Sequence, residues 1–169
     1  MIVSAFAALV SSGGAPRASI YMGKKKPESA EEILGGCFML QILVSLILTV
    51  VLLVFGKNLL LAFGASENTL SYALDYMRIY AFGTLFVQVT LGMNAFITAQ
   101  GFTTVSMISV LIGAICNITL DPVFIFGLNM GVKGAALATI LSQAVSCVWV
   151  VVFLCGKKTL IHIRKKYLK

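Results

Sequence analysis

Charged residues are scarce in this sequence. They make up 11% of its 169 residues, whereas 59% are hydrophobic and the mean hydropathy is +0.99. A soluble domain has about 25% charged residues. This deficit excludes a soluble globule of the same size, because too few polar groups are available to cover its surface. Apolar side chains can instead face the hydrocarbon of a lipid bilayer. The composition therefore predicts an integral membrane protein.

Residues that bind metals or carry out catalysis are also few. Histidine occurs once, and no two cysteines have the C-x-x-C spacing. This pattern favours neither a zinc site nor a disulfide framework, so we expect the cysteines to be small buried apolar side chains. They all lie in apolar stretches: Cys37, Cys116, Cys147 and Cys155. The sequence has no nucleophile beside a base and no glycine-rich phosphate loop. It therefore predicts no catalytic or metal site, no cofactor and no enzyme activity.

The net charge of +7 does not indicate nucleic-acid binding. That function needs a stripe of arginine and lysine along one element. Here the basic residues form short clusters beside apolar runs, where they attract anionic lipid headgroups. The expected partner is membrane lipid, and nucleic acid is not expected.

Five apolar stretches are each long enough for a helix to cross a hydrocarbon core of about 30 Å. They cover residues 1–22, 33–55, 76–99, 104–126 and 132–155. Long continuous runs favour helices over membrane strands, which alternate in polarity over about ten residues. Short polar connectors separate several of these runs, at 23–29, 64–69 and 127–131. The sequence predicts an all-α, polytopic transmembrane bundle of about five helices, with residues 1–169 forming a single integral domain.

The basic residues divide unequally between the two ends of the predicted helices. One end holds Lys57, Arg78 and Lys133, whereas the other holds nine: Lys24, Lys25, Lys26, Lys157, Lys158, Arg164, Lys165, Lys166 and Lys169. The positive-inside rule predicts that the loop at 24–26 and the C-terminal tail are cytoplasmic, in a multi-pass protein of the cell membrane. The first stretch then runs from outside to inside, so we expect a further helix to precede Met1.

Most of the six carboxylates lie near the ends of the predicted helices. Glu28, Glu31, Glu32 and Glu67 fall in connectors or first turns, and Asp75 is three residues from Arg78, with which we expect an exposed ion pair. Asp121 is the exception, because seventeen mostly apolar residues precede it in its stretch. An ionisable group at membrane depth is a candidate functional site. The competing interpretation is that Asp-Pro simply ends the helix.

Neighbouring residues make Asp121 a candidate ion or proton site. Asn117 is four residues earlier, hence on the same helical face, and Pro122 frees a carbonyl near Ile118. These oxygen and amide groups suit Na⁺ or a proton better than a transition metal. Thr139 on the last helix offers a hydroxyl, although helix packing explains it equally well. We expect other polar side chains to form hydrogen bonds between helices: Gln88, Asn94, Thr98 and Gln100.

Three segments together resemble one transporter family. They are GAPRAS (14–19) with AEEILG (30–35), MNAFITAQGFTTVSM (93–107) and NITLDPVFIFGLNMGVKGAALATILSQ (117–143). Their order and spacing are similar to those of MATE (multidrug and toxic compound extrusion) transporters, from the second to the sixth helix. The resemblance covers essentially the whole chain.

The resemblance implies part of the N-terminal lobe of a twelve-helix antiporter. Such a protein exports drugs and organic cations in exchange for Na⁺ or H⁺. Asn117, Asp121 and Thr139 match the family's coupling-site positions. The family's first helix, with its central carboxylate, and its C-terminal lobe have no counterpart in this sequence. Two alternatives stay open: a flippase of related fold for lipid-linked oligosaccharides, and a nonfunctional membrane fragment.

Overall fold

The computed structural model describes residues 2–156, 159–163 and 166. Within them the chain forms five α-helices and one π-helical segment, which continues the fourth helix. These are α1 (Ile2–Gly23), α2 (Pro27–Ala62), α3 (Glu67–Ala99), α4 (Thr103–Pro122), η1 (Val123–Gly127) and α5 (Gly131–Cys155). The described residues contain no strand, so the predicted all-α fold is confirmed.

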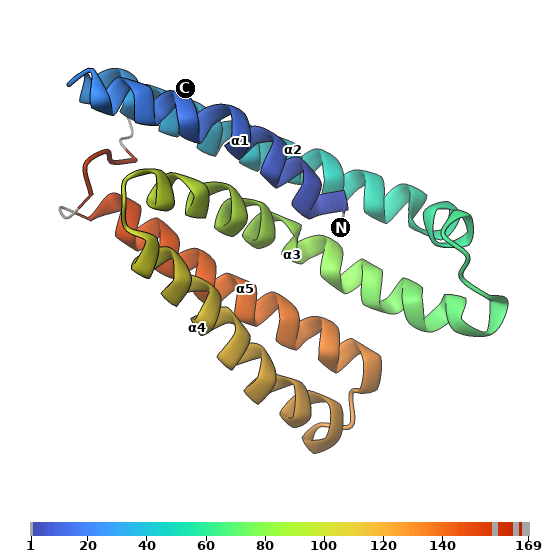
Figure 1. The fold of residues 1–169 in the computed structure, drawn as a ribbon. Helices are drawn as coiled ribbons and strands as arrows, with labels where there is room; N and C mark the ends of the chain where they lie inside the picture. The colour runs from blue at the N-terminus through green and yellow to red at the C-terminus, as the bar shows by residue number, and fades with distance from the viewer. Residues whose placement is uncertain (1, 157–158, 164–165, 167–169) are drawn as a thin grey trace.

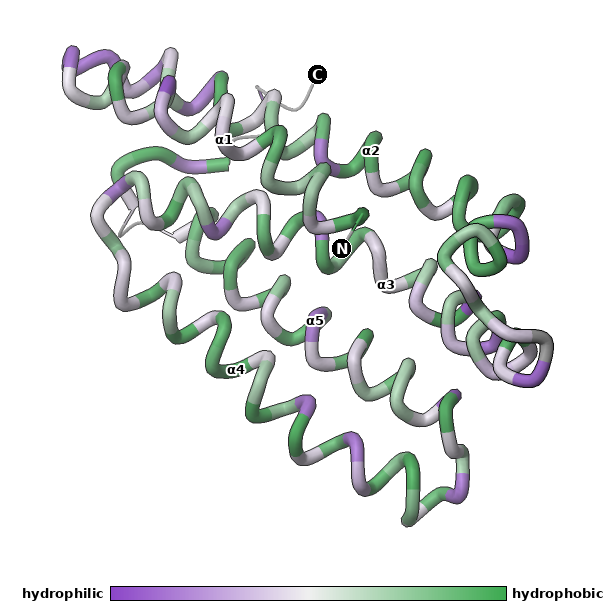
Figure 2. Tube along the Cα trace, turned by 45° about the vertical axis from the view of Figure 1, so that its right-hand side comes forward, coloured by the Kyte–Doolittle hydropathy of each residue, from purple (hydrophilic) through white to green (hydrophobic). Residues whose placement is uncertain are grey.

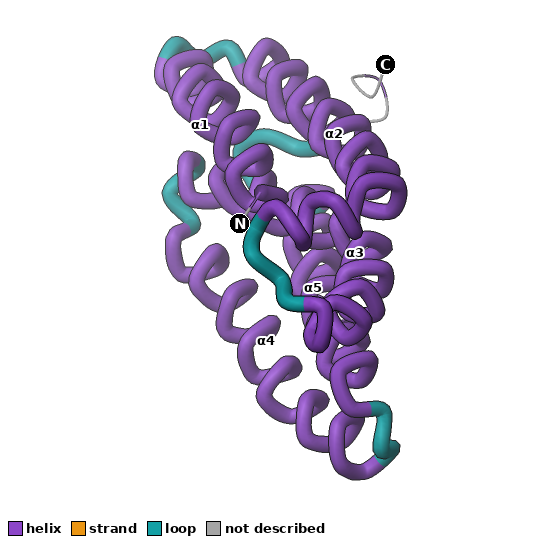
Figure 3. The backbone as a smooth tube through the Cα atoms, turned by 90° about the vertical axis from the view of Figure 1, so that its right-hand side faces the viewer, coloured by secondary structure: helices purple, strands orange, loops and turns teal. Residues whose placement is uncertain are grey.

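Helix α3 is the centre of the arrangement. It contacts α1 and α2 on one side and the α4–α5 hairpin on the other, as Figure 1 shows. Figure 3 shows α4 standing apart from α1 and α2, and among the described elements it contacts only α3, α5 and η1. Consecutive helices run antiparallel through short loops, as expected of a multi-pass bundle.

Local sequence signals place the helix ends beyond the apolar runs. Pro27 begins α2, where its missing N–H costs nothing, and Glu28 lies in the first turn. Gly64 and Gly101 have φ of +89° and +88°, and each closes a helix in a left-handed conformation that suits glycine. At the first of these ends, the amide of Ala65 donates to the carbonyl of Leu60 at 3.0 Å.

Two helices are therefore longer than predicted. α2 has 36 residues rather than the expected stretch 33–55, and α3 begins at Glu67 rather than near residue 76. Within the described part of the chain, four helical stretches are able to cross a membrane by length and composition: α2, α3 from Asn68, α4 continued by η1, and α5. α1 has 22 residues but includes Pro16 and Arg17, and it is not among these four.

Small and apolar side chains form the core at one end of the bundle. The buried cluster joins α1, α2, α3, α5 and the segment after α5: Ala15, Ala18, Ala30, Leu34, Val89, Met93, Phe96, Ile97, Cys147, Val150, Leu154 and Ile161. Apolar residues, green in Figure 2, run along all the helices, and many of them are exposed; Val54 is 66% exposed and Ile118 is 70% exposed. Lipid-facing helices have this distribution. Of the cysteines, Cys147 is buried but Cys155 is exposed, so the expectation of burial is wrong for Cys155.

Residues 159–163, which we call the C-terminal strap, fold back against the helices. The side-chain carbonyl of Gln100 accepts hydrogen bonds from the amides of Leu160 (2.9 Å) and Ile161 (3.2 Å). The strap thus lies at the same end of the bundle as the α1–α2 loop, because His162 donates its amide to Glu31 near the start of α2. Most basic residues of the predicted tail lie outside the described residues: Lys157, Lys158, Arg164, Lys165 and Lys169.

The ion pair at the opposite end differs from the expected one. Asp75 Oδ2 lies 3.4 Å from Lys133 Nζ, whereas its expected partner was Arg78. A spacing of three residues permits a contact on one helix, but Lys133 reaches Asp75 from the first turn of the neighbouring helix α5. The pair therefore joins α3 to α5.

Candidate functional site

The candidate site centres on two side chains of α4. Asn117 and Asp121 are one helical turn apart, and Asn117 Nδ2 donates to Asp121 Oδ1 at 3.3 Å. Both side chains are half-buried. The structure thus brings together the two residues that the four-residue spacing predicted to share a face, and it gives the carboxylate an amide donor.

The backbone changes its hydrogen-bonding pattern directly after Asp121. Pro122 is the last α-helical residue, and the chain continues helically as the π-helical η1, where the amide of Leu128 donates to the carbonyl of Val123 at 2.9 Å. Because proline lacks an N–H, the carbonyl of Ile118 loses its usual donor. The Asp-Pro pair does end the α-helix, but Asp121 still lies inside a continuous helical stretch from Thr103 to Gly127.

Helix α5 approaches this π-helical turn closely. A Cβ added at Gly134 would meet the backbone C and O of Phe124 at 2.8 Å, which is too close for any larger residue without a backbone shift. Gly134 and Ala138 are small residues four apart on α5, a pattern that lets membrane helices pack closely. Because Gly134 has no side chain, η1 packs closely against α5 at this position.

A cavity of about 240 Å³ lies among α3, α4 and α5, next to the candidate pair; many of its lining residues are polar, although most of its surface is apolar. Asn117 and Thr139 both line it, from opposite helices, while Asp121 is not among its lining residues. Thr139 Oγ1 donates to the carbonyl of Ala135, one turn earlier on its own helix, at 2.9 Å. The predicted trio is thus connected through Asn117, which touches Asp121 on one side and the cavity on the other. Further polar side chains line it: Thr90, Asn94, Ser109, Ser142, Gln143 and Ser146.

The charge of Asp121 has no basic partner in the part of the chain that the structure describes. The ion pair found there is the one between Asp75 and Lys133. A half-buried carboxylate with one amide donor and without a counter-ion at membrane depth is a candidate functional site. The donor set consists of carboxylate, amide and hydroxyl oxygens, which matches hard monovalent ions rather than transition metals.

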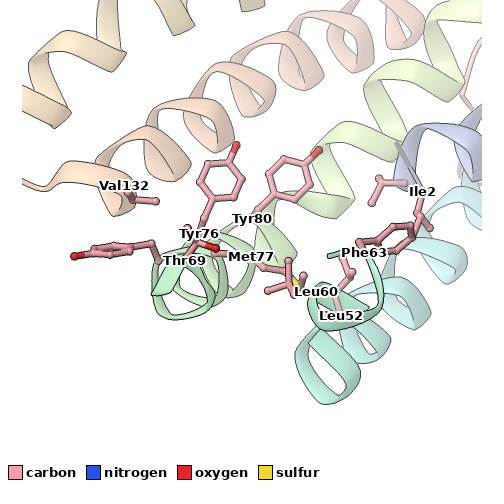
Figure 4. Close-up of a pocket in the computed structure, with 12 residues that line it drawn as sticks. Ile2, Leu52, Leu60, Phe63, Thr69, Tyr76, Met77, Tyr80 and Val132 are labelled. Carbon is pink, nitrogen blue, oxygen red and sulfur yellow. The ribbon is translucent and has the colours of Figure 1, made fainter. Parts of the chain in front are cut away.

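A larger pocket of about 690 Å³ lies elsewhere, at the end of the bundle where α2 and α3 meet (Figure 4). Tyr72, Tyr76 and Tyr80 line it from successive turns of α3, together with Phe63, and most of its surface is apolar. The rings of Tyr76 and Tyr80 stack with centroids 5.9 Å apart. Among the described side chains, no carboxylate lines this pocket.

The sequence did not predict the surroundings of two buried polar residues, Glu31 and Gln88. Glu31 was expected to be an ordinary first-turn acid, yet it is 3% exposed and accepts the amide of His162. Asn94, Thr98 and Gln100 form the expected hydrogen bonds to other segments. Gln88 is fully buried but has no partner for its amide in the described residues. Thr84 and Gln88 are four residues apart, so the sequence did indicate that both lie on one face of α3.

The long apolar helices and the half-buried carboxylate define a multi-pass membrane protein with a polar site between helices. The family model described as MatE matches residues 1–123. The chain belongs to the MatE family. Members of this family are transporters rather than enzymes. The matched region contains Asn117 and Asp121, whereas Thr139 lies beyond it.

Two curated relatives are multidrug export proteins named MepA. The one from Staphylococcus haemolyticus is 30% identical over 168 residues, which is 99% of this chain and 37% of that protein. One from Staphylococcus aureus is 30% identical over 146 residues, which is 86% of this chain and 31% of that protein. The chain thus spans about a third of the length of these relatives.

Solved structures show the same helix arrangement. An inward-facing multidrug resistance transporter of the MATE family superimposes with a TM-score of 0.92 at 25% identity, covering 99% of this chain and 38% of the other. An outward-facing structure gives 0.90 at 26% identity, covering 99% and 37%. The fold of this chain therefore corresponds to a part of a MATE transporter.

Proposed function

We propose that this chain forms part of the N-terminal lobe of a secondary transporter that exports drugs and organic cations by antiport with Na⁺ or H⁺. The relatives named as multidrug export proteins support the export function. The whole activity requires segments beyond this chain, which matches about a third of each relative. The partners we propose are membrane lipid, small cationic substrates and the remaining helices of the transporter.

The proposed coupling site is Asp121 with Asn117 and Thr139. The observation that carries this proposal is the 3.3 Å hydrogen bond between Asn117 and Asp121, beside a cavity that Thr139 also lines. Binding of an ion or proton removes the cost of a bare carboxylate at membrane depth. If the site is open to different faces in different conformations, its occupancy ties the conformational equilibrium to the ion gradient.

The freed backbone near Pro122 supports the same site. The carbonyl of Ile118 lacks its usual helical donor, and the π-helical turn that follows widens the backbone. Segments of this kind are frequent at functional sites, and irregular backbone at membrane depth is tolerated where it lines a cavity. Backbone carbonyls therefore supply additional oxygen ligands close to Asp121.

The test is an Asp121→Asn variant of the full-length transporter, assayed by efflux of a fluorescent lipophilic cation from cells. This variant keeps shape and hydrogen bonding but removes the charge, so efflux loses its dependence on the Na⁺ or pH gradient while protein levels hold. Asn117→Ala weakens the dependence less, because the charge remains. Asp75→Asn is the matched control, since that carboxylate pairs with Lys133 at the end of the bundle and leaves coupling intact. Parent-like efflux of Asp121→Asn at every Na⁺ concentration and pH overturns the assignment.

A further inference from the structure

Helices α2 and α3 lie against one another in a register that three contacts define. Gln41 occupies the space beside Gly92, and Thr49 Oγ1 donates to the carbonyl of Ala81 at 3.0 Å. Towards the other end, a Cβ on Gly56 would meet Met77 Sδ at 2.9 Å. Because the helices are antiparallel, residue numbers rise on α2 as they fall on α3.

This register places four polar side chains along one line of contact. Ser45 lies midway between Gln41 and Thr49, so it lies opposite the turn of α3 that contains Gln88. Thr84 is the next turn along α3. We call Gln41, Ser45, Thr84 and Gln88 the α2–α3 polar seam; each of them is 0% exposed.

Two of the six polar side-chain atoms of the seam form hydrogen bonds within the described protein. Gln41 Nε2 donates to the carbonyl of Ala7 at 3.1 Å, and Ser45 Oγ donates to the carbonyl of Ile42 at 2.7 Å. Within the described residues, no hydrogen-bond partner exists for Gln41 Oε1, Thr84 Oγ1 or either amide atom of Gln88. Four polar atoms along the α2–α3 contact thus lack a hydrogen-bond partner among the described residues.

These atoms lie too deep for water from outside the membrane to reach them along an exposed surface. Each seam residue is at least eleven residues from an end of its helix, or about 16 Å at 1.5 Å per residue. A buried amide or hydroxyl without a hydrogen bond is unfavourable, because nothing replaces the water that it loses on burial. Because lipid offers no hydrogen bonds, the partner must be a molecule held inside the protein.

The seam groups define the chemistry of that molecule. They comprise one amide donor, two amide carbonyl acceptors and one hydroxyl, and none is charged. A cation would leave Gln88 Nε2 unpaired, and an anion would face carbonyl oxygens. Water has two donors and two acceptors and needs two to four polar partners when buried. We propose that the α2–α3 polar seam is an internal hydration site that binds water between Gln41, Thr84 and Gln88.

The bound water serves as a bridge between α2 and α3 within the lobe. It joins Gln41 on one helix to Thr84 and Gln88 on the other, where no direct hydrogen bond between these side chains is found in the described residues. This inference does not rest on the proposed coupling role of Asp121, which lies on α4. If the hydration site is disproved, the proposed coupling site still stands, and the reverse is also true.

The test is water-edited solid-state NMR of the full-length protein in lipid bilayers with ¹⁵N-labelled glutamine. Gln88→Met identifies the Gln88 signal by its loss. Rapid transfer of polarisation from water to the Gln88 amide is expected in the parent. Thr84→Val keeps the shape but removes one water ligand, so transfer falls to roughly half or less.

Thr49→Val is the matched control. Its hydroxyl already donates to the carbonyls of Ser45 and Ala81, so its loss leaves the transfer to Gln88 unchanged. Slow transfer to the Gln88 amide in the parent, unchanged in Thr84→Val, overturns the proposal, because the seam is then dry. Equal losses in Thr49→Val and Thr84→Val also overturn it, since loosened packing explains them. A Gln88 shift on replacing Na⁺ by choline assigns the seam to a cation instead.

Discussion

The side-chain carbonyl of Gln100 lies 2.9 Å from the backbone nitrogen of Leu160, a residue 60 positions later in the sequence. Gln100 is the C-cap of α3, and it also accepts the amide of Ile161. A single side chain thus fixes the segment that leaves α5 to the central helix of the bundle. The buried Ile161 and the bond from His162 to Glu31 complete this attachment.

Removing the acceptor should release the C-terminal strap. Gln100→Leu leaves the two strap amides without their partner, at a cost of about 1–3 kcal/mol for the buried amide of Ile161 and less for the partly buried amide of Leu160. We expect a lower thermal midpoint and faster tryptic cleavage after α5. Gln100→Glu retains an acceptor and should behave much more like the parent. If both variants are cleaved at the parent rate, Gln100 does not hold the strap.

Topology can be tested at two exposed positions at opposite ends of the bundle. Single cysteines replace Lys25 in the α1–α2 loop and Asn68 at the start of α3, in a background without other cysteines. Because the basic end is predicted to be cytoplasmic, a membrane-impermeant maleimide should label position 68 but not 25 in intact cells. Permeabilised cells, in which both positions react, serve as the control. Labelling at 25 alone in intact cells reverses the orientation.

Two glycines beside the π-helical turn should respond differently to alanine. Gly134→Ala places a methyl group 2.8 Å from the backbone of Phe124, so η1 must shift, and we expect a loss of about 1–3 kcal/mol of stability. Gly127→Ala is the control within η1 itself, since its nearest neighbour is Val123 Cγ1 at 4.0 Å. Thermal denaturation of both variants in one detergent compares them. Equal midpoints contradict the close packing of α5 on η1.

The apolar runs predicted the helices well because contact with lipid selects for apolar side chains. They did not predict the helix ends. α3 begins at Glu67 with a polar first part that has no apolar run, and Pro27 and Glu28 begin α2 through local backbone effects. Hydropathy therefore reports which residues face hydrocarbon, and helical structure continues beyond that zone.

The part of the candidate site that lies on a single helix was predictable from the sequence. Asn117 and Asp121 are one turn apart on one helix, so their spacing predicts their hydrogen bond. Thr139 lies on another helix, and only the packing of α4 on α5 brings it to the cavity that Asn117 lines. The buried Glu31 accepts a hydrogen bond from His162 of the C-terminal strap, at a sequence separation of 131. No local pattern encodes such a contact.

Because α2 is long, we expect its tilt to depend on the thickness of the bilayer. Its 36 residues span about 54 Å, whereas the hydrocarbon core is about 30 Å thick. Apolar side chains continue past Lys57 to the helix end, where Leu61 is 44% exposed and Phe63 beyond it is 75% exposed. An apolar stretch that extends past the hydrocarbon core is accommodated by tilting the helix or thickening the surrounding lipid. A thicker membrane therefore favours a more upright α2, and through the shared register it also reorients α3.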